Sequence, residues 1–114
     1  MVQFQPIELD AVFHALSDGT RRAMVERLSA GPQSVSDLAA PFDMSLAGAS
    51  KHIRVLESAG LVRREVRGRT HRCTLDAARL KHAKDWLARY EKFWNARLDA
   101  LEALLSAEEG KTHD

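Results

Sequence analysis

The chain contains a single cysteine, Cys73, among its 114 residues. A lone cysteine excludes a framework of intramolecular disulfides and is consistent with a reducing cytosol. No run of about 18 or more apolar residues occurs, so no segment is predicted to span a membrane. Residues 1–6 lack the basic stretch and apolar run of a signal peptide, which predicts a cytoplasmic protein.

Residue clusters that would carry chemistry are missing as well. The five histidines are scattered, and no motif joins a nucleophile to a base. Asp99, Glu102, Glu108 and Glu109 fall on a C-terminal helical segment, where a solvated face is a simpler interpretation than a carboxylate active site. We therefore expect neither enzymatic activity nor a resident cofactor or metal. Histidines that meet at a subunit interface are the less favoured alternative.

The net charge of +1 conceals an uneven distribution. Between Ser45 and Leu75 there are seven basic residues and two acidic ones, a local charge of +5, so the rest of the chain carries −4. Such a basic block inside a nearly neutral chain is typical of a surface that binds a polyanion. A solvated, arginine-rich hairpin without a partner would have the same composition.

The hydrophobic pattern before Met44 predicts three helices. Residues 8–16 place their apolar side chains on one side. Asp18 is a good N-cap for a second helix, which Gly31 and Pro32 would end. Ser36 is a good N-cap for a brief third helix that Pro41 would truncate.

A fourth helix is predicted after the N-cap Ser45, ending at Gly60. Its apolar residues recur at helical spacing and form an inward stripe of Leu46, Ala49, Ile53 and Leu56. Residues 61–67 and 70–75 are rich in Val, Thr and Arg, and they predict an antiparallel hairpin around Gly68.

The last helix is expected from about Ala78 to Ala107, with Asp76 as its cap and residues 108–114 as a flexible tail. The predicted fold is therefore mainly α with a small β-hairpin wing, in the order α-α-α-α-β-β-α. Residues 1–107 would form one winged helix-turn-helix domain with dimerising terminal helices.

The fourth helix has the two faces that a DNA recognition helix needs. One face is apolar and docks on the domain, while the other is small and polar enough to enter the major groove. The hairpin would place two arginines at its tip, where a wing reaches a flanking groove or backbone. The predicted DNA-binding residues are Ser45, Ala47, Gly48, Ser50, Lys51, His52, Arg54, Arg67 and Arg69. The alternative is a winged-helix adaptor that binds an acidic protein partner.

The C-terminal helical segment carries more apolar side chains than a chain of this size can cover by itself. An apolar stripe of that length usually marks an interface. We therefore predict a homodimer that binds an inverted-repeat operator in double-stranded DNA. The predicted interface residues are Leu9, Phe13, Leu87, Tyr90, Trp94, Leu98, Leu101 and Leu105.

Two strings of the chain resemble the ArsR/SmtB-type winged-helix regulators. They are residues 16–28 (LSDGTRRAMVERL) and residues 45–62 (SLAGASKHIRVLESAGLV), and the likeness runs from about residue 8 to residue 105. The resemblance implies a homodimer packed through its first and last helices. It also implies repression by occlusion of a promoter and release by an inducer.

The metal-ligand motifs of that family are not reproduced. Where some members have Cys-x-Cys in a CVCDL string, this chain has Ser34 and Ser36 in SVSDL, and hydroxyls are poor ligands for soft metal ions. The second familiar site uses histidines and acids of the last helix, where His82 stands alone. Cys73 is interpreted as a small buried thiol rather than a sensor. The inducer is not evident from the sequence.

Overall fold

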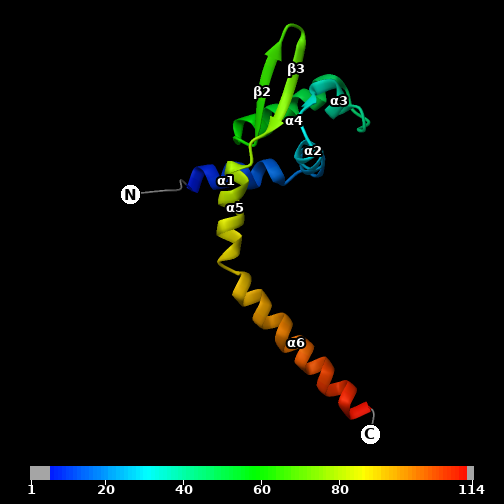
Figure 1. Ribbon diagram of the computed structural model, residues 1–114, viewed down its shortest axis with the longest axis vertical. Coiled ribbons are helices and arrows are strands. Elements are labelled where there is room, and N and C mark those ends of the chain that lie inside the picture. Colours follow the sequence, from blue (N-terminus) through cyan, green and yellow to red (C-terminus); the bar gives the residue numbers. More distant parts are fainter. Residues whose placement is uncertain (1–5, 113–114) are drawn as a thin grey trace. The chain divides into compact units, whose positions relative to one another are not determined.

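A computed structural model describes the backbone of residues 6–112 and the side chains of residues 8–109. The elements follow the order α1 (Pro6–Leu16), α2 (Gly19–Ser29), β1 (Gln33–Ser34), α3 (Val35–Ala39), α4 (Leu46–Ser58), β2 (Val62–Arg67), β3 (Thr70–Leu75), α5 (Ala78–Ala88) and α6 (Glu91–Thr112). The chain divides after Ala83 into two compact units. In Figure 1 the first unit has the predicted helices and the β2–β3 hairpin. No helix within residues 6–112 is long and apolar enough to cross a membrane.

The first unit has one hydrophobic core, to which α1, α2, α3, α4 and the hairpin all contribute. Its largest fully buried side chains are Met24, Leu38, Ile53, Leu56, Leu61, Val12 and Cys73. The predicted interface residues Leu9 and Phe13 of α1 are partly buried against this core. The core therefore fixes α4 and the hairpin in one unit, and this positions the candidate DNA-binding surface.

Helix starts follow the polar residues that the sequence offers. The side chains of Asp18 and Ser45 accept hydrogen bonds from the backbone N–H groups of Arg21 and Gly48, both at 3.0 Å. Asp76 accepts from the N–H of Ala78 at 3.1 Å. The predicted cap of α3 is wrong by two residues, because Ser34, not Ser36, accepts from the N–H of Asp37. Ser34 can do so because its own backbone is extended (φ −70°, ψ 160°).

A three-stranded antiparallel sheet has the order β1-β3-β2. The predicted hairpin is confirmed, with Val62 opposite Leu75 and Arg67 opposite Thr70. Gly68 makes the turn with a φ of +61°, which glycine adopts readily. The strand β1 was not expected, because two residues are too few to form an alternating pattern.

The predicted last helix is two helices in the structure. The helix α5 ends at Ala88, and α6 runs from Glu91 to Thr112. At the break, the N–H groups of Arg89 and Tyr90 bond to carbonyls three residues earlier, which tightens the last turn of α5. Neither glycine nor proline lies there, so no local signal marks it. The helix α6 passes the expected end at Ala107; residues 113–114 of the predicted tail lie outside the described residues.

Candidate nucleic-acid interface

The helix α4 has a buried face and an exposed face. Ala49, Ile53 and Leu56 are fully buried, as the sequence pattern predicts. The exposed face carries most of the predicted DNA-binding residues of this helix: Ser45, Ala47, Lys51 and Arg54 are exposed, and Gly48 and Ser50 are half-buried. The result is an N-terminal half of α4 with short side chains and an adjacent pair of basic ones.

Gly48 is small for a local structural reason. A Cβ added at this position would lie 3.3 Å from Oγ of Ser45, the oxygen that caps the helix. A side chain at residue 48 would therefore crowd the N-cap as well as the exposed surface. The cap and the small face of α4 depend on the same two residues.

The prediction for Leu46 is wrong. This residue was expected in the inward stripe, but 56% of its surface is exposed. Leu46 is the first residue of α4, ahead of the turn that packs on the core, and it lines a pocket instead. Helical periodicity assigns a residue to a face but does not say where along the helix the core ends.

His52 does not lie freely on the exposed face, contrary to its predicted place. Its side chain is only 25% exposed, and its Nδ1 lies 3.2 Å from Nη1 of Arg21 and 3.8 Å from Oδ2 of Asp18. Since arginine can only donate, Nδ1 of His52 accepts this hydrogen bond. The contact ties α4 to the start of α2.

Arg21, at the start of α2, is buried. Its Nε donates to the carbonyl of Ala15 at 2.7 Å, and Nη2 donates to the carbonyl of His14 at 3.2 Å. These carbonyls end α1, so the arginine joins three helices. Arg21 is buried here because its guanidinium can donate several hydrogen bonds at once; its positive charge alone would not explain the burial.

Asp18 completes this group of charges. The hydrogen bond from the backbone N–H of Arg21 holds the pKa of Asp18 below its ordinary value, and the nearby charge of the Arg21 guanidinium acts in the same direction. The carboxylate therefore caps α2 and balances the guanidinium beside it.

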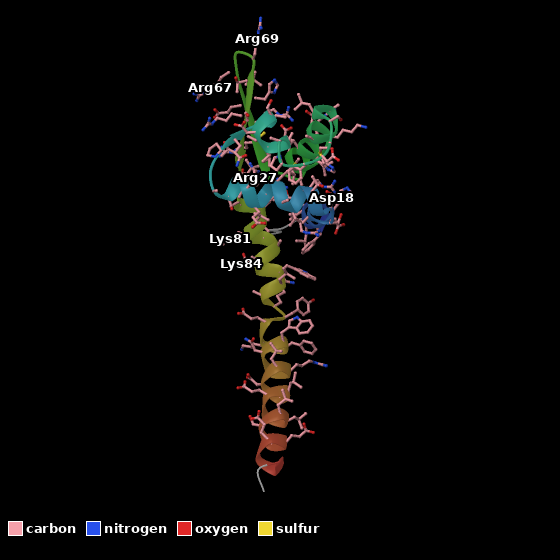
Figure 2. The ribbon with its side chains drawn as sticks, turned by 90° about the vertical axis from the view of Figure 1, so that its right-hand side faces the viewer. Asp18, Arg27, Arg67, Arg69, Lys81 and Lys84 are labelled. Carbon is pink, nitrogen blue, oxygen red and sulfur yellow. The ribbon has the colours of Figure 1, made fainter. Side chains whose placement is uncertain are left out.

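The hairpin presents the predicted arginines at its tip. Arg67 and Arg69 project from the turn between β2 and β3 (Figure 2). Both are exposed, and Nη2 of Arg67 lies 3.4 Å from Oε2 of Glu65. An exposed ion pair of this kind contributes little stability, so both arginines remain available to a polyanion.

Arg64 plays a part that the sequence analysis missed. Its Nη2 donates to Oε1 of Glu57 at 2.6 Å, which joins β2 to the C-terminal half of α4. Its Nη1 lies 3.4 Å from Nδ1 of His71, on the neighbouring strand. Arg64 and His71 are seven residues apart in the sequence and share no motif. The register of the hairpin, with Arg64 opposite Cys73, brings them together.

Cys73 is buried, as expected for a structural thiol. Burial raises its pKa above the ordinary value, and this outweighs the opposite effect of Arg64. A thiol of this kind stays protonated and is a poor nucleophile. Among the described residues there is no group of three or more His, Cys, Asp or Glu side chains placed to hold a metal ion.

The C-terminal helices carry the exposed apolar stripe that the sequence indicated. Its large side chains are each at least 44% exposed, and they are Leu87, Tyr90, Phe93, Trp94, Leu98, Leu101, Leu104 and Leu105. The rings of Phe93 and Trp94 pack edge to face, and the guanidinium of Arg97 lies 4.4 Å from the ring centre of Phe93. These residues form an aromatic cluster at the start of α6, continued by leucines.

Comparison with known proteins agrees with this geometry. Residues 16–65 match the model of a helix-turn-helix domain family. The chain is 36% identical to the HTH-type transcriptional regulator Rv2034 of Mycobacterium tuberculosis over 99 residues. This alignment covers 87% of this chain and 90% of that protein. It is 27% identical over 82 residues to the transcriptional repressor SdpR of Bacillus subtilis, or 72% of this chain and 91% of the repressor.

Solved structures give the same result. A crystal structure of an ArsR family transcriptional regulator has a TM-score of 0.75 and 42% identity, covering 83% of this chain and 97% of that one. The homodimeric winged helix-turn-helix DNA-binding domain of Mb0332 from Mycobacterium bovis has a TM-score of 0.61 and 25% identity, covering 80% and 93%. The predicted winged helix-turn-helix fold is confirmed, and the family is one of transcriptional regulators rather than enzymes. The chain belongs to the ArsR family of winged helix-turn-helix, DNA-binding transcriptional regulators.

Proposed function

We propose that this regulator is a repressor, which binds an inverted-repeat operator as a homodimer and occludes the promoter. The observation that carries the proposal is the pairing of a small, exposed helix face with an arginine-tipped hairpin in one unit. Ala47, Gly48 and Ser50 let the backbone of α4 approach base edges, and Lys51 and Arg54 can bind guanine or phosphate. Such a protein acts where the DNA is, in the cytoplasm.

Dimerisation is proposed from the stripe on α5 and α6. Eight large apolar side chains exposed on two successive helices exceed what a monomer usually leaves in water. We propose that Leu9 and Phe13 of α1 also contribute to the dimer interface; one structural relative is homodimeric. A two-fold dimer would hold its recognition helices about 34 Å apart, one turn of DNA.

Repression is supported by the comparisons. SdpR, one of the relatives, is a repressor. We further propose that an inducer releases the protein. This inducer would not be a thiophilic metal bound at Ser34 and Ser36, because hydroxyl groups are poor ligands for soft metal ions and the Ser34 oxygen already caps α3.

The test is a selection from a pool of random duplexes, followed by transcription in vitro. We expect an inverted repeat with half-site centres about 10 base pairs apart. A promoter that overlaps the selected site should give less transcript when the protein is added. A pool that enriches no motif would favour a protein-interaction adaptor, and a rise in transcript would favour an activator.

A further inference from the structure

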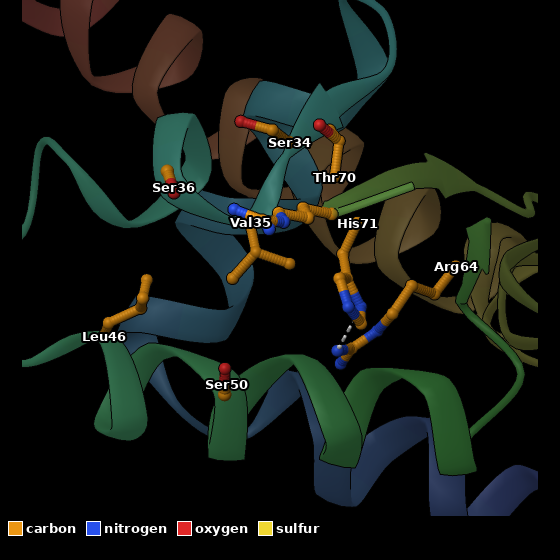
Figure 3. A pocket seen from close by; sticks show the side chains of 9 residues that line it. Ser34, Val35, Ser36, Leu46, Ser50, Arg64, Thr70 and His71 are labelled. Atoms are coloured by element: carbon orange, nitrogen blue, oxygen red, sulfur yellow. Dashed lines mark hydrogen bonds between the residues drawn. The ribbon is translucent and has the colours of Figure 1, made fainter. Parts of the chain in front are cut away.

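A pocket of about 400 Å³ lies between α3, the first half of α4 and the hairpin. Figure 3 shows Leu46 and Ser50 of α4 on one side of it, Val35 and Ser36 of α3 opposite, and His71 with Arg64 at the end toward the hairpin. None of the residues that line it is acidic. The lining combines hydroxyl groups, two guanidinium groups, one imidazole and two apolar side chains.

The place of the pocket follows from the geometry of DNA. In a duplex, one sugar–phosphate backbone separates each major groove from the neighbouring minor groove. If α4 enters the major groove and the hairpin tip reaches the adjacent minor groove, that backbone must cross the space between them. The pocket occupies this space, because it is lined by Leu46 and Ser50 from the helix and by Arg69, Thr70 and His71 from the hairpin.

The chemistry of the lining fits a sugar–phosphate segment. Hydroxyl groups and N–H groups donate to phosphate oxygens, and Val35 and Leu46 offer an apolar surface to a deoxyribose. Ser34 accepts a hydrogen bond at its oxygen, so its own hydroxyl proton is still available for donation.

Among the residues that line the pocket, His71 is the one whose donor and acceptor atoms can be assigned from its neighbour. Nη1 of Arg64 lies 3.4 Å from its Nδ1, and an arginine can only donate, so Nδ1 accepts. In a neutral imidazole the proton must then be on Nε2, which makes Nε2–H a donor. Arg64 is itself held by Glu57 at 2.6 Å, with its side chain only 18% exposed. Glu57 and Arg64 therefore hold the ring and select its tautomer.

We propose that this pocket binds a DNA backbone phosphate, with Nε2–H of His71 as a direct donor and Arg64 as the positioning residue. The proposal rests on the proposed function, since it requires α4 and the hairpin to engage one duplex. The proposal adds His71, as a binding residue, and Arg64, as a positioning residue, to the predicted DNA-binding surface. His71 is thereby a binding residue that contributes a hydrogen bond but no full positive charge.

The experiment measures affinity for the selected duplex by fluorescence anisotropy over a range of salt concentrations. One hydrogen bond to a charged acceptor corresponds to roughly a tenfold change in affinity, and the dimer would make two, so His71→Ala should bind roughly a hundredfold more weakly. Because a neutral donor displaces no counterion, the dependence of affinity on salt should not change. His71→Gln keeps an N–H donor and should bind more tightly than His71→Ala.

His14→Ala is the matched control. His14 is an exposed histidine of α1 whose backbone carbonyl accepts hydrogen bonds from Ser17 and Arg21, and the substitution retains that carbonyl. This variant should bind as the unaltered protein does. Equal affinity of His71→Ala and the unaltered protein would overturn the proposal, even where the selection had succeeded. Failure of the selection itself would remove the proposed function, and this proposal with it.

Substitution of single phosphates by methylphosphonate identifies the partner. At one position in each half-site, the neutral group should weaken the unaltered protein about tenfold but should weaken His71→Ala by less than about twofold. Identical scans for the two proteins would overturn the assignment. Sodium phosphate is titrated without DNA against sodium chloride at equal ionic strength, with the imidazole NMR signals as the readout. Saturation of the His71 signal at low millimolar phosphate would identify a free-anion site instead.

Discussion

Arginine side chains have three different structural roles in this chain. Arg21 is buried and bonds to the ends of helices, Arg64 is paired with Glu57 beneath the hairpin, and Arg67 and Arg69 are exposed at the tip. Guanidinium groups can do all of this because they offer several donors in a plane and stay charged when buried. Arg21 lies outside the basic block of residues 45–75, and Arg64 is cancelled within it by Glu57, so the local charge of +5 is carried by exposed side chains.

The arginines at the tip of the hairpin carry a prediction about salt. Arg67→Ala combined with Arg69→Ala should weaken binding to all duplexes alike, because contacts to phosphate do not depend on the base sequence. A dimer presents two copies of each arginine, so if all four bind phosphate, the slope of log affinity against log salt should fall in magnitude by about 3.6. The measurement is an anisotropy titration at several salt concentrations.

A control for that experiment removes two positive charges elsewhere. Lys81 and Lys84 are exposed on α5, and their joint substitution by alanine causes the same change in net charge (Figure 2). This variant should keep nearly the full salt slope. An equal loss of slope in both variants would mean that net charge, and not the hairpin, accounts for the effect.

Asp18 carries a prediction about acid. Its pKa is lower in the folded chain than its ordinary value, so the ionised carboxylate stabilises the fold at neutral pH, and this contribution is lost as the pH falls through the folded pKa. Asp18→Ala also removes the N-cap of α2 and should lower the free energy of unfolding at pH 7 by about 1 kcal/mol. In strong acid the difference between the two proteins should become smaller, as urea denaturation would measure.

Asp43 provides the comparison for Asp18. It is exposed in the turn between α3 and α4, and no described helix is capped by it. Asp43→Ala should change the free energy of unfolding by less than about 0.5 kcal/mol. A difference between Asp18→Ala and the unaltered protein that stayed constant from neutral to acid pH would assign the whole effect to the lost cap.

At the scale of the element, the C-terminus of α4 is determined by one glycine. The N–H of Gly60 bonds to the carbonyl of Glu57, and the N–H of Leu61 bonds to that of Leu56, both at 2.9 Å. This is a Schellman motif, which requires the left-handed backbone that Gly60 adopts at φ +78°. The motif ends α4 and places Leu61, fully buried, directly before β2.

Gly60→Ala should therefore destabilise the domain. A Cβ in the left-handed conformation costs roughly 1–2 kcal/mol, and at this position it would also lie 3.1 Å from Nε of Arg79, a side chain that can move. We expect the free energy of unfolding to fall by about that amount in thermal or urea denaturation. Ser58→Ala, at the exposed last residue of α4 and two residues before Gly60, should have almost no effect; a similar loss there would argue against the backbone explanation.

Elements were predictable where a local residue type fixes the backbone. Asp18, Ser45 and Gly60 mark the ends of α2 and α4 because capping and left-handed turns have residue requirements. The strand β1 depends on pairing with β3, and the break between α5 and α6 has no glycine or proline, so neither has a local signal. The predicted places of Leu46 and His52 were wrong because helical periodicity carries no information about contacts with other elements. His52 contacts Arg21 of α2, and Leu46 lines the pocket beside α3.

At the scale of the whole molecule, the C-terminal stripe makes oligomeric state the central question. In a two-fold dimer each leucine of the interface is buried twice, so Leu98→Asp removes two apolar contacts and adds two charges. Burial of a leucine contributes roughly 1.5–3 kcal/mol, so dimerisation should weaken by several hundredfold or more. Sedimentation would measure this. Ala103→Asp, on the opposite side of α6 from Leu98, should remain dimeric.

Dimerisation then makes a geometric prediction about DNA. Two recognition helices held about 34 Å apart contact successive major grooves on one side of the duplex, so affinity should depend on the phase of the half-sites and not only on their sequence. Inserting five base pairs, about half a turn, between the half-sites would put them on opposite sides, and binding should fall to that of a single half-site. Inserting ten would restore the side but stretch the separation to about 68 Å, which a dimer joined by packed helices cannot span. Both insertions should therefore weaken the unaltered protein, whereas Leu98→Asp should bind the original and the altered operators equally.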